Sequence, residues 1–206
     1  MLNCIAGKIY NTSIFDIFKT KHKGIVIDEF LLRDSKRVDF HRFSPILSAD
    51  GTVTARNSAP LAEGASLAVM ASPSVVNDHE LDPLGYFLGY AVCAVDPSLM
   101  GMGAATAICK LLKRTGLSLD DIDLFEINEP FASIRLATLN QLGLTLDRVN
   151  LNGSALALGH PYGMSGTRLS VLYYVSLNES TDGWGLLPHA SAEAWVLPHC
   201  SSDDIE

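Results

Sequence analysis

The feature that most limits how this chain can fold is a Gly159-His160-Pro161 turn inside residues 149–167. A short apolar, strand-like run precedes the turn, and a helical pattern begins after Gly166. Gly159 lets the backbone turn without a Cβ clash, and Pro161 fixes φ so that the bend can take few shapes. The pattern predicts a strand, a tight turn that carries His160, and a helix. A histidine there can exchange protons near neutral pH, and a simply packed histidine is the alternative interpretation.

Apolar periodicity elsewhere predicts an α/β domain. A nearly continuous apolar run at 83–95 indicates a strand buried on both faces, and the amphipathic helix that follows ends at Gly116. Strand, helix and strand in this order form a βαβ unit, so we expect a parallel sheet. The other expected elements are a strand at 23–30, a buried helix within 61–72, a strand at 123–127, a helix at 131–144 that ends at Gly143, a strand at 149–158, a helix after Gly166 and a last strand within 184–198.

The composition narrows the class of partner and the environment. The 15 basic and 23 acidic residues give a net charge of −8, which disfavours nucleic acid and anionic membranes as partners. No apolar run approaches the roughly 20 residues that a membrane-spanning helix needs. The four cysteines are scattered without metal-ligand spacing, as is typical of reduced thiols. With no targeting segment legible, we expect an intracellular protein of the mitochondrial matrix or cytoplasm.

A second candidate for chemistry is Asn128, at the start of a predicted helix. It follows directly after the predicted strand 123–127. Ligands in open α/β sheets collect at the carboxyl ends of strands, and His160 also follows a predicted strand. We therefore expect Asn128 and His160 to meet on one rim of the sheet. The alternative interpretation of Asn128 is a helix N-cap that satisfies the amides of the first turn.

Four sequence blocks, in order and at matching spacing, carry a family resemblance. They are 36–40 (KRVDF), 51–65 (GTVTARNSAPLAEGA), 101–132 (GMGAATAICKLLKRTGLSLDDIDLFEINEPFA) and 149–168 (VNLNGSALALGHPYGMSGTR). Together they resemble the C-terminal half of the thiolase family, the acetyl-CoA acetyltransferases. The GMSG run at 163–166 looks most like the mitochondrial acetoacetyl-CoA type. The resemblance covers most of the chain from about residue 23 to residue 185.

The resemblance implies a fold and a domain organisation. The fold class is α/β, and the fold is thiolase-like. The resemblance implies a C-terminal βαβαβ domain, whose helices pack on a mixed or parallel sheet. The N-terminal half of the family fold is expected to be truncated. Residues 1–59 correspond to a remnant of the thiolase loop region. Residues 60–83 correspond to the tail of the N-terminal thiolase domain, and residues 84–206 to the C-terminal thiolase domain.

The resemblance also implies a reaction and the residues that serve it. Thiolases make or cleave a carbon–carbon bond next to a thioester, as in acetoacetyl-CoA thiolysis or Claisen condensation. The histidine of the G-H-P motif activates the nucleophile. It forms an oxyanion hole with a water held by the asparagine of the N-E-A-F motif, and these roles match His160 and Asn128. The substrate-binding positions that the resemblance implies are Asn57, Ser58, Phe131 and Gly159. The substrate is an acyl-CoA or acetyl-CoA thioester and no cofactor is required. Potassium is not expected, because Arg56 lies in the matching region.

Neither cysteine of that reaction has a match in this chain. The resemblance puts the nucleophilic cysteine in the half that is missing, and the second in a C-x-G-G-G segment where this chain has GLLPHASA at 185–192. Without both thiols the lone chain is expected to be inactive. The alternatives are a non-catalytic partner or assembly subunit of a full-length thiolase, and a gene fragment. An apolar face left uncovered by a second domain would predict a homo-oligomer.

Overall fold

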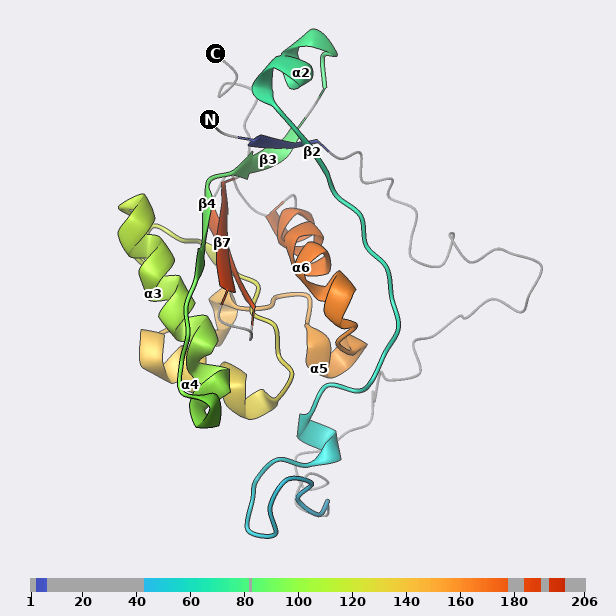
Figure 1. Ribbon diagram of the computed structural model, residues 1–206, viewed down its shortest axis with the longest axis vertical. Coiled ribbons are helices and arrows are strands. Elements are labelled where there is room, and N and C mark those ends of the chain that lie inside the picture. The colour runs from blue at the N-terminus through green and yellow to red at the C-terminus, as the bar shows by residue number, and fades with distance from the viewer. Residues whose placement is uncertain (1–2, 7–42, 82, 178–183, 190–192, 199–206) are drawn as a thin grey trace, which may run out of the picture.

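The computed structural model describes residues 3–6, 43–81, 83–177, 184–189 and 193–198 of the 206-residue chain (Figure 1). The strand predicted at 23–30 and the sequence block at 36–40 lie outside these residues. The strands are β1 (Asn3–Ala6), β2 (Val69–Ala71), β3 (Pro83–Phe87), β4 (Gly89–Val92), β5 (Leu124–Phe125), β6 (Trp184–His189) and β7 (Glu193–Pro198). The helices are α2 (Pro73–Asp78), α3 (Gly103–Thr115), α4 (Ala132–Leu142), α5 (Ala155–Leu158) and α6 (Tyr162–Leu177), with 3-10 turns at Ala55–Asn57, Pro97–Met102 and Leu146–Arg148.

The main sheet has four strands in the order β4-β7-β6-β5. Strands β5 and β6 are parallel, whereas β7 runs antiparallel to both of its neighbours. Strands β4 and β5 therefore point the same way, as a βαβ unit requires, but two strands separate them. The region 184–198, where one strand was predicted, forms the antiparallel pair β6 and β7 and fills that space. The sheet is consequently mixed, and α3 and α6 lie on opposite sides of it (Figure 1).

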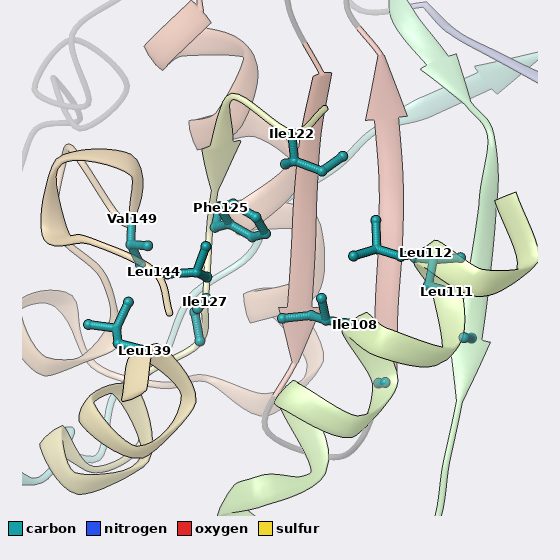
Figure 2. Close-up of a cluster of buried hydrophobic side chains, with 11 residues drawn as sticks. Ile108, Leu111, Leu112, Ile122, Phe125, Ile127, Leu139, Leu144 and Val149 are labelled. Carbon is teal, nitrogen blue, oxygen red and sulfur yellow. The ribbon is translucent and has the colours of Figure 1, made fainter. Parts of the chain in front are cut away.

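Helix α3 has the amphipathic character that its sequence predicts. Its apolar stripe is buried against the sheet, and its end at Gly116 has the left-handed φ of 77° that favours glycine. The stripe joins side chains from β5, from α4 and from the loops between them in one hydrophobic core (Figure 2). Members of this core include Ile108, Leu111, Ile122, Phe125, Ile127, Leu139, Leu144 and Val149. Helix α4 likewise ends at Gly143, with a φ of 67°.

The single strand predicted at 83–95 is two strands. Strand β3 pairs with β1 in a separate three-stranded sheet of order β2-β1-β3, and β4 pairs with β7. Residue Leu88 lies between them and packs partly buried against the core. The two halves of the apolar run belong to different sheets, although no polar residue separates them. Periodicity alone could therefore not locate the break.

The strand predicted at 149–158 is wrong beyond its first residue. Val149 pairs with Phe125 in a parallel bridge, but Asn150 then takes a φ of 52° and the chain enters α5. The Asn150 side chain accepts a hydrogen bond from the Ile127 amide at 2.6 Å and donates to the Ile127 carbonyl at 2.8 Å. These two bonds replace the backbone pairing of a longer strand, because an asparagine amide can imitate a peptide group.

Helix α6 begins at Tyr162, earlier than the predicted start after Gly166. The carbonyl of Pro161 accepts hydrogen bonds from the amides of Met164 and Ser165, each at 3.0 Å. A proline at the start of a helix is favourable, since its fixed φ suits the first turn and its missing N–H would have no partner within the helix. The proline therefore decides where this helix begins.

The helix predicted within 61–72 does not form. Residues 61–68 run in an extended path beside α6, and only 69–71 are regular, as β2 (Figure 1). Leu61 is 92% exposed and Leu67 is 81% exposed. A helix of small residues depends on a neighbour that buries its apolar side. Most side chains of this segment are exposed in the described structure, so the burial that such a helix needs is lacking.

Candidate active site

The extended run that continues β5 separates apolar from polar side chains. Phe125 and Ile127 enter the hydrophobic core (Figure 2). Successive side chains of an extended chain point to opposite faces, so Glu126 and Asn128 lie on the other face. Both are buried, at 1% and 0% exposure. The run therefore carries two polar groups into the interior on the side where the His160 turn lies.

The turn that carries His160 is held against the segment that crosses in front of it. Gly159 has a φ of 85°, and a Cβ built on it would lie 2.4 Å from the Cβ of Ala62. The His160 amide donates to the Pro60 carbonyl at 3.4 Å. His160 thus follows α5 and not a strand, in contrast to the prediction. Glycine at 159 is required both by the backbone angle and by the close approach of the neighbouring chain.

Asn128 and His160 meet through their side chains. The Nδ2 atom of Asn128 lies 3.2 Å from the Nε2 atom of His160. On the other side of the imidazole, Nδ1 lies 2.7 Å from the hydroxyl of Ser165. The ring also makes an edge contact with Tyr162, with centroids 4.8 Å apart. The structure therefore brings together the two residues for which the sequence suggested chemistry.

The remaining residues implied by the resemblance lie near this pair in different ways. Asn57 is used by a local turn, because its Oδ1 accepts from the Thr54 amide at 2.8 Å and its Nδ2 donates to a nearby carbonyl. Ser58 donates to the Thr54 carbonyl at 2.7 Å. A backbone bridge joins Ser58 to Phe131, which is the N-cap residue of α4. Ser58 and Phe131 therefore lie beside each other, while the polar groups of Asn57 have partners in their own turn.

Ser165 is a site residue that the sequence reasoning missed. It is fully buried, and its hydroxyl also donates to the Pro161 carbonyl at 3.0 Å. A serine in the first turns of a helix that directly follows a histidine turn is the available signal, since the start of the helix brings its side chain back over the turn. The sequence predicts that α6 starts after Gly166, which leaves Ser165 outside the helix, so its contact with the turn is not predicted.

A buried ionic network beneath the site was also missed. Glu129 accepts hydrogen bonds from Asn150 at 2.6 Å and from Arg135 at 2.8 Å. Glu126 has no such direct ion pair among the described residues, and burial, reinforced by the Glu129 charge, raises its pKa to about 8. Arg168 opposes that shift from α6. The network places compensating charges under the run that carries Asn128.

Comparison with known proteins identifies the family. The family model of the thiolase C-terminal domain matches residues 81–194, which include both Asn128 and His160. The chain belongs to the thiolase family. The mitochondrial 3-ketoacyl-CoA thiolase of Homo sapiens is 42% identical over 144 residues, which make up 70% of this chain and 36% of that protein. The acetyl-CoA acetyltransferase of Chromobacterium violaceum is 36% identical over 170 residues, or 81% of this chain and 43% of the relative.

Solved thiolase structures agree with the fold. The crystal structure of human mitochondrial 3-ketoacyl-CoA thiolase in complex with CoA superposes with a TM-score of 0.82 at 35% identity. It covers 87% of this chain and 46% of the human chain. A crystal structure of the Bacillus anthracis acetyl-CoA acetyltransferase also gives a TM-score of 0.82, at 34% identity over 88% of this chain. The α/β, thiolase-like fold expected from the sequence is thereby confirmed, and the chain spans less than half the length of these relatives.

Two further observations concern the described residues alone. None of the described helices is long and apolar enough to cross a membrane. Two cysteines, 93 and 109, have described side chains: Cys93 donates to the Gly103 carbonyl, and Cys109 is exposed on α3. Helix α3 lies across the sheet from α6 (Figure 1). Neither thiol therefore belongs to the elements that build the Asn128–His160 pair.

Proposed function

We propose that this thiolase-family chain provides the histidine–asparagine part of an acyltransferase site that binds a coenzyme A thioester. The observation that carries the proposal is the 3.2 Å contact between the side chains of Asn128 and His160. A protonated His160 and the Asn128 amide would each present an N–H, and two donors at this spacing can both reach one oxygen. That oxygen is the thioester carbonyl, on which negative charge develops during acyl transfer.

The same pair suits the acid–base part of thiolysis and of Claisen condensation. An imidazole can take the proton of a thiol and become the charged donor that stabilises the resulting oxyanion. The reaction also needs thiol nucleophiles. Of the four cysteines in this sequence, those at 93 and 109 lie on the α3 side of the sheet and Cys4 belongs to β1. The segment 185–192, which matches the second cysteine motif, has none, and Cys200 lies beyond it. We therefore propose that the lone chain binds its thioester but does not turn it over.

The deciding experiment measures binding and turnover on the same protein. Calorimetric titration with acetyl-CoA is expected to give saturable binding, which His160→Ala and Asn128→Ala each weaken about twofold to tenfold, the range for one hydrogen bond. An acetoacetyl-CoA thiolysis assay is expected to show no rate above background. The matched control is Asn140→Ala on the exposed side of α4, which should bind like the wild type. Absence of thioester binding in the wild type would refute the proposal, and thiolysis lost in His160→Ala would refute the inactivity.

A second candidate function, supported by a separate observation, is that of a non-catalytic partner or assembly subunit. Large apolar side chains are exposed along 61–70, with Leu61 at 92%, Leu67 at 81% and Met70 at 52%. Contiguous exposed apolar residues are typical of protein interfaces. The partner would be a second copy of this chain or a full-length thiolase, and the solved relatives include a crystal structure titled as the dimeric peroxisomal thiolase of Saccharomyces cerevisiae.

Light scattering tests this candidate function directly. The chain is expected to self-associate, and Leu67→Asp, which puts a charge on the exposed segment, is expected to shift it toward monomer. Ser118→Asp, an exposed position away from the segment, is the control. A monodisperse wild-type monomer that neither self-associates nor binds an added full-length thiolase would refute the assembly function, and a gene fragment without selected function would then remain.

The accompanying proposals concern cofactor and compartment. We propose that the chain needs no cofactor and holds no potassium at the region of Arg56, whose guanidinium stacks on the Phe43 ring at 4.8 Å. We place it inside the cell, in the mitochondrial matrix or the cytoplasm. Relatives named as mitochondrial enzymes support the first of these, although others are named as peroxisomal.

A further inference from the structure

The hydroxyl of Ser165 lies between two groups whose hydrogen-bonding roles differ. The Pro161 carbonyl, 3.0 Å away, can only accept a hydrogen bond. The Nδ1 atom of His160, 2.7 Å away, can either donate or accept. A serine hydroxyl has one proton, so a bond to Pro161 uses it. The imidazole must then donate from Nδ1–H to the serine oxygen.

The opposite side of the imidazole agrees with this assignment. Asn128 presents its Nδ2 amide to Nε2 at 3.2 Å, and an amide nitrogen can only donate. Nε2 must therefore carry a lone pair and no proton. One consistent chain of hydrogen bonds then runs from the Asn128 amide through the His160 ring and the Ser165 hydroxyl to the Pro161 carbonyl.

The reversed chain satisfies fewer groups. Heavy-atom positions alone do not separate the two ends of an amide or the two tautomers of a histidine. If the Asn128 amide were turned and Ser165 donated to Nδ1, the bond to Pro161 would be lost. The buried position that Oδ1 now occupies, where it has no hydrogen-bond partner, would hold an unpaired NH₂ group instead. The reversed chain makes two bonds where the first makes three.

We propose that Ser165 is a positioning residue, which holds neutral His160 as the Nδ1–H tautomer so that its unprotonated Nε2 faces Asn128. The catalytic meaning of this inference rests on the proposed function. When Nε2 takes a proton from a thiol, the products are a thiolate and an imidazolium. The Nδ1–H bond to Ser165 is unchanged by that step. The new Nε2–H and the Asn128 amide are then two donors that no longer bond to each other. Both can donate a hydrogen bond to the thioester oxygen.

Helix α6 supplies the geometry that Ser165 needs. A serine that bonds back to the carbonyl four residues earlier is restricted to one side-chain orientation. Because this carbonyl belongs to Pro161, directly beside His160, the same bond aims the serine oxygen at the ring. Ser170 makes the equivalent bond to the Gly166 carbonyl at 3.1 Å on the same helix and is 7% exposed. It is a matched control without a histidine partner.

The test is the ¹⁵N spectrum of the full chain labelled at histidine, recorded without ligand at a pH where His160 is neutral. The His160→Ala variant assigns the signals. The wild type should show Nδ1 protonated and Nε2 unprotonated. Ser165→Ala should lower the ratio of the Nδ1–H to the Nε2–H tautomer about twofold to tenfold, the effect of one ordinary hydrogen bond. Ser165→Thr, which keeps the hydroxyl, should restore the ratio, and Ser170→Ala should leave it unchanged.

Two results would overturn the proposal. One is a wild-type His160 protonated at Nε2. The other is a Ser165→Ala variant that unfolds cooperatively and has the wild-type tautomer ratio, a comparison that stands even if Ser165→Thr does not fold. The spectrum needs neither substrate nor turnover. A chain that binds no acetyl-CoA can still show the expected tautomer, so failure of the proposed function and failure of this inference are distinguishable.

Discussion

The guanidinium of Arg168 donates a hydrogen bond to the carbonyl of Gly159 at 2.8 Å, from α6 to the residue directly before His160. Arg168 is only 9% exposed, and burial lowers the pKa of its guanidinium, although Glu126 and Glu129 oppose that shift. A buried cation therefore holds the turn that presents the histidine. Glu126 compensates this charge only where it is ionised, because burial raises its pKa to about 8.

Removing this cation should destabilise the fold. Arg168→Met is expected to lower the free energy of unfolding by about 1.5–3 kcal/mol, the range for a hydrogen bond to a charged group. Urea denaturation at pH 7 measures the change. Arg114→Met, which removes an exposed arginine that bonds the Tyr90 carbonyl, should change stability by less than about 0.5 kcal/mol. Equal effects of the two substitutions would contradict a structural role for the buried arginine.

The buried carboxyl of Glu126 should make stability depend on pH. Its folded pKa of about 8 lies above the ordinary value of 4.5, so between these values the folded chain keeps a proton that the unfolded chain has released. Stability is then fully present at the acidic end and falls as pH rises toward 8, by up to about 1.4 kcal/mol per unit for one group. Above that pKa the loss is complete.

Glu126→Gln should remove this pH dependence. The variant is expected to be more stable than the wild type at pH 8, and the difference should shrink as pH falls to 5 because a neutral carboxyl and an amide are then similar. Urea denaturation at several pH values gives both curves. Asp121→Asn, at an exposed carboxylate that bonds Ser118, is the control for general charge effects. Parallel curves for Glu126→Gln and the wild type would show that Glu126 is ionised throughout.

Gly159 and Gly163 should respond in opposite ways to the same substitution. Gly159→Ala meets a φ of 85° and a contact of 2.4 Å with Ala62, so it should cost about 1–3 kcal/mol for the backbone alone. Gly163→Ala lies inside α6 with nothing within 4 Å of the new Cβ, and should stabilise by up to about 1 kcal/mol. Thermal unfolding of both variants measures the contrast. A Gly159→Ala variant as stable as the wild type would mean that the turn relaxes freely.

Asn150 should matter through its contacts with the run that carries Asn128. Asn150→Ala removes the bonds to both backbone groups of Ile127 and the bond to Glu129, in a site only 5% exposed. At about 1 kcal/mol for each bond, a loss of about 2–4 kcal/mol is expected in urea denaturation. Asn140→Ala, on an exposed part of α4, should instead be neutral or slightly stabilising, because alanine favours helices. A small effect at Asn150 would indicate that water replaces its bonds.

Several features of this protein follow from the sequence alone. The ends of α3 and α4 are set by Gly116 and Gly143, because a left-handed residue at a helix end is a local requirement. The amphipathic stripe of α3 likewise identifies its buried side without knowledge of its neighbours. The Gly-His-Pro turn and the asparagine at 128 stood out because their residue types are chemically unusual at those positions. The family could be recognised from such local motifs.

The tertiary structure decided what depends on partners distant in the sequence. Of the strand predicted at 149–158, only Val149 pairs with β5. The Asn150 side chain makes the bonds to Ile127 that a longer strand would make. The β6–β7 pair separates β4 from β5, which no periodicity within either strand could reveal. The contact of Asn128 with His160, 32 residues away, and the burial of Glu126 depend on the same packing. Local residue types determined the turns and helix ends, whereas strand order, buried charge and the site contacts required the folded chain, because their energies come from residues far apart in sequence.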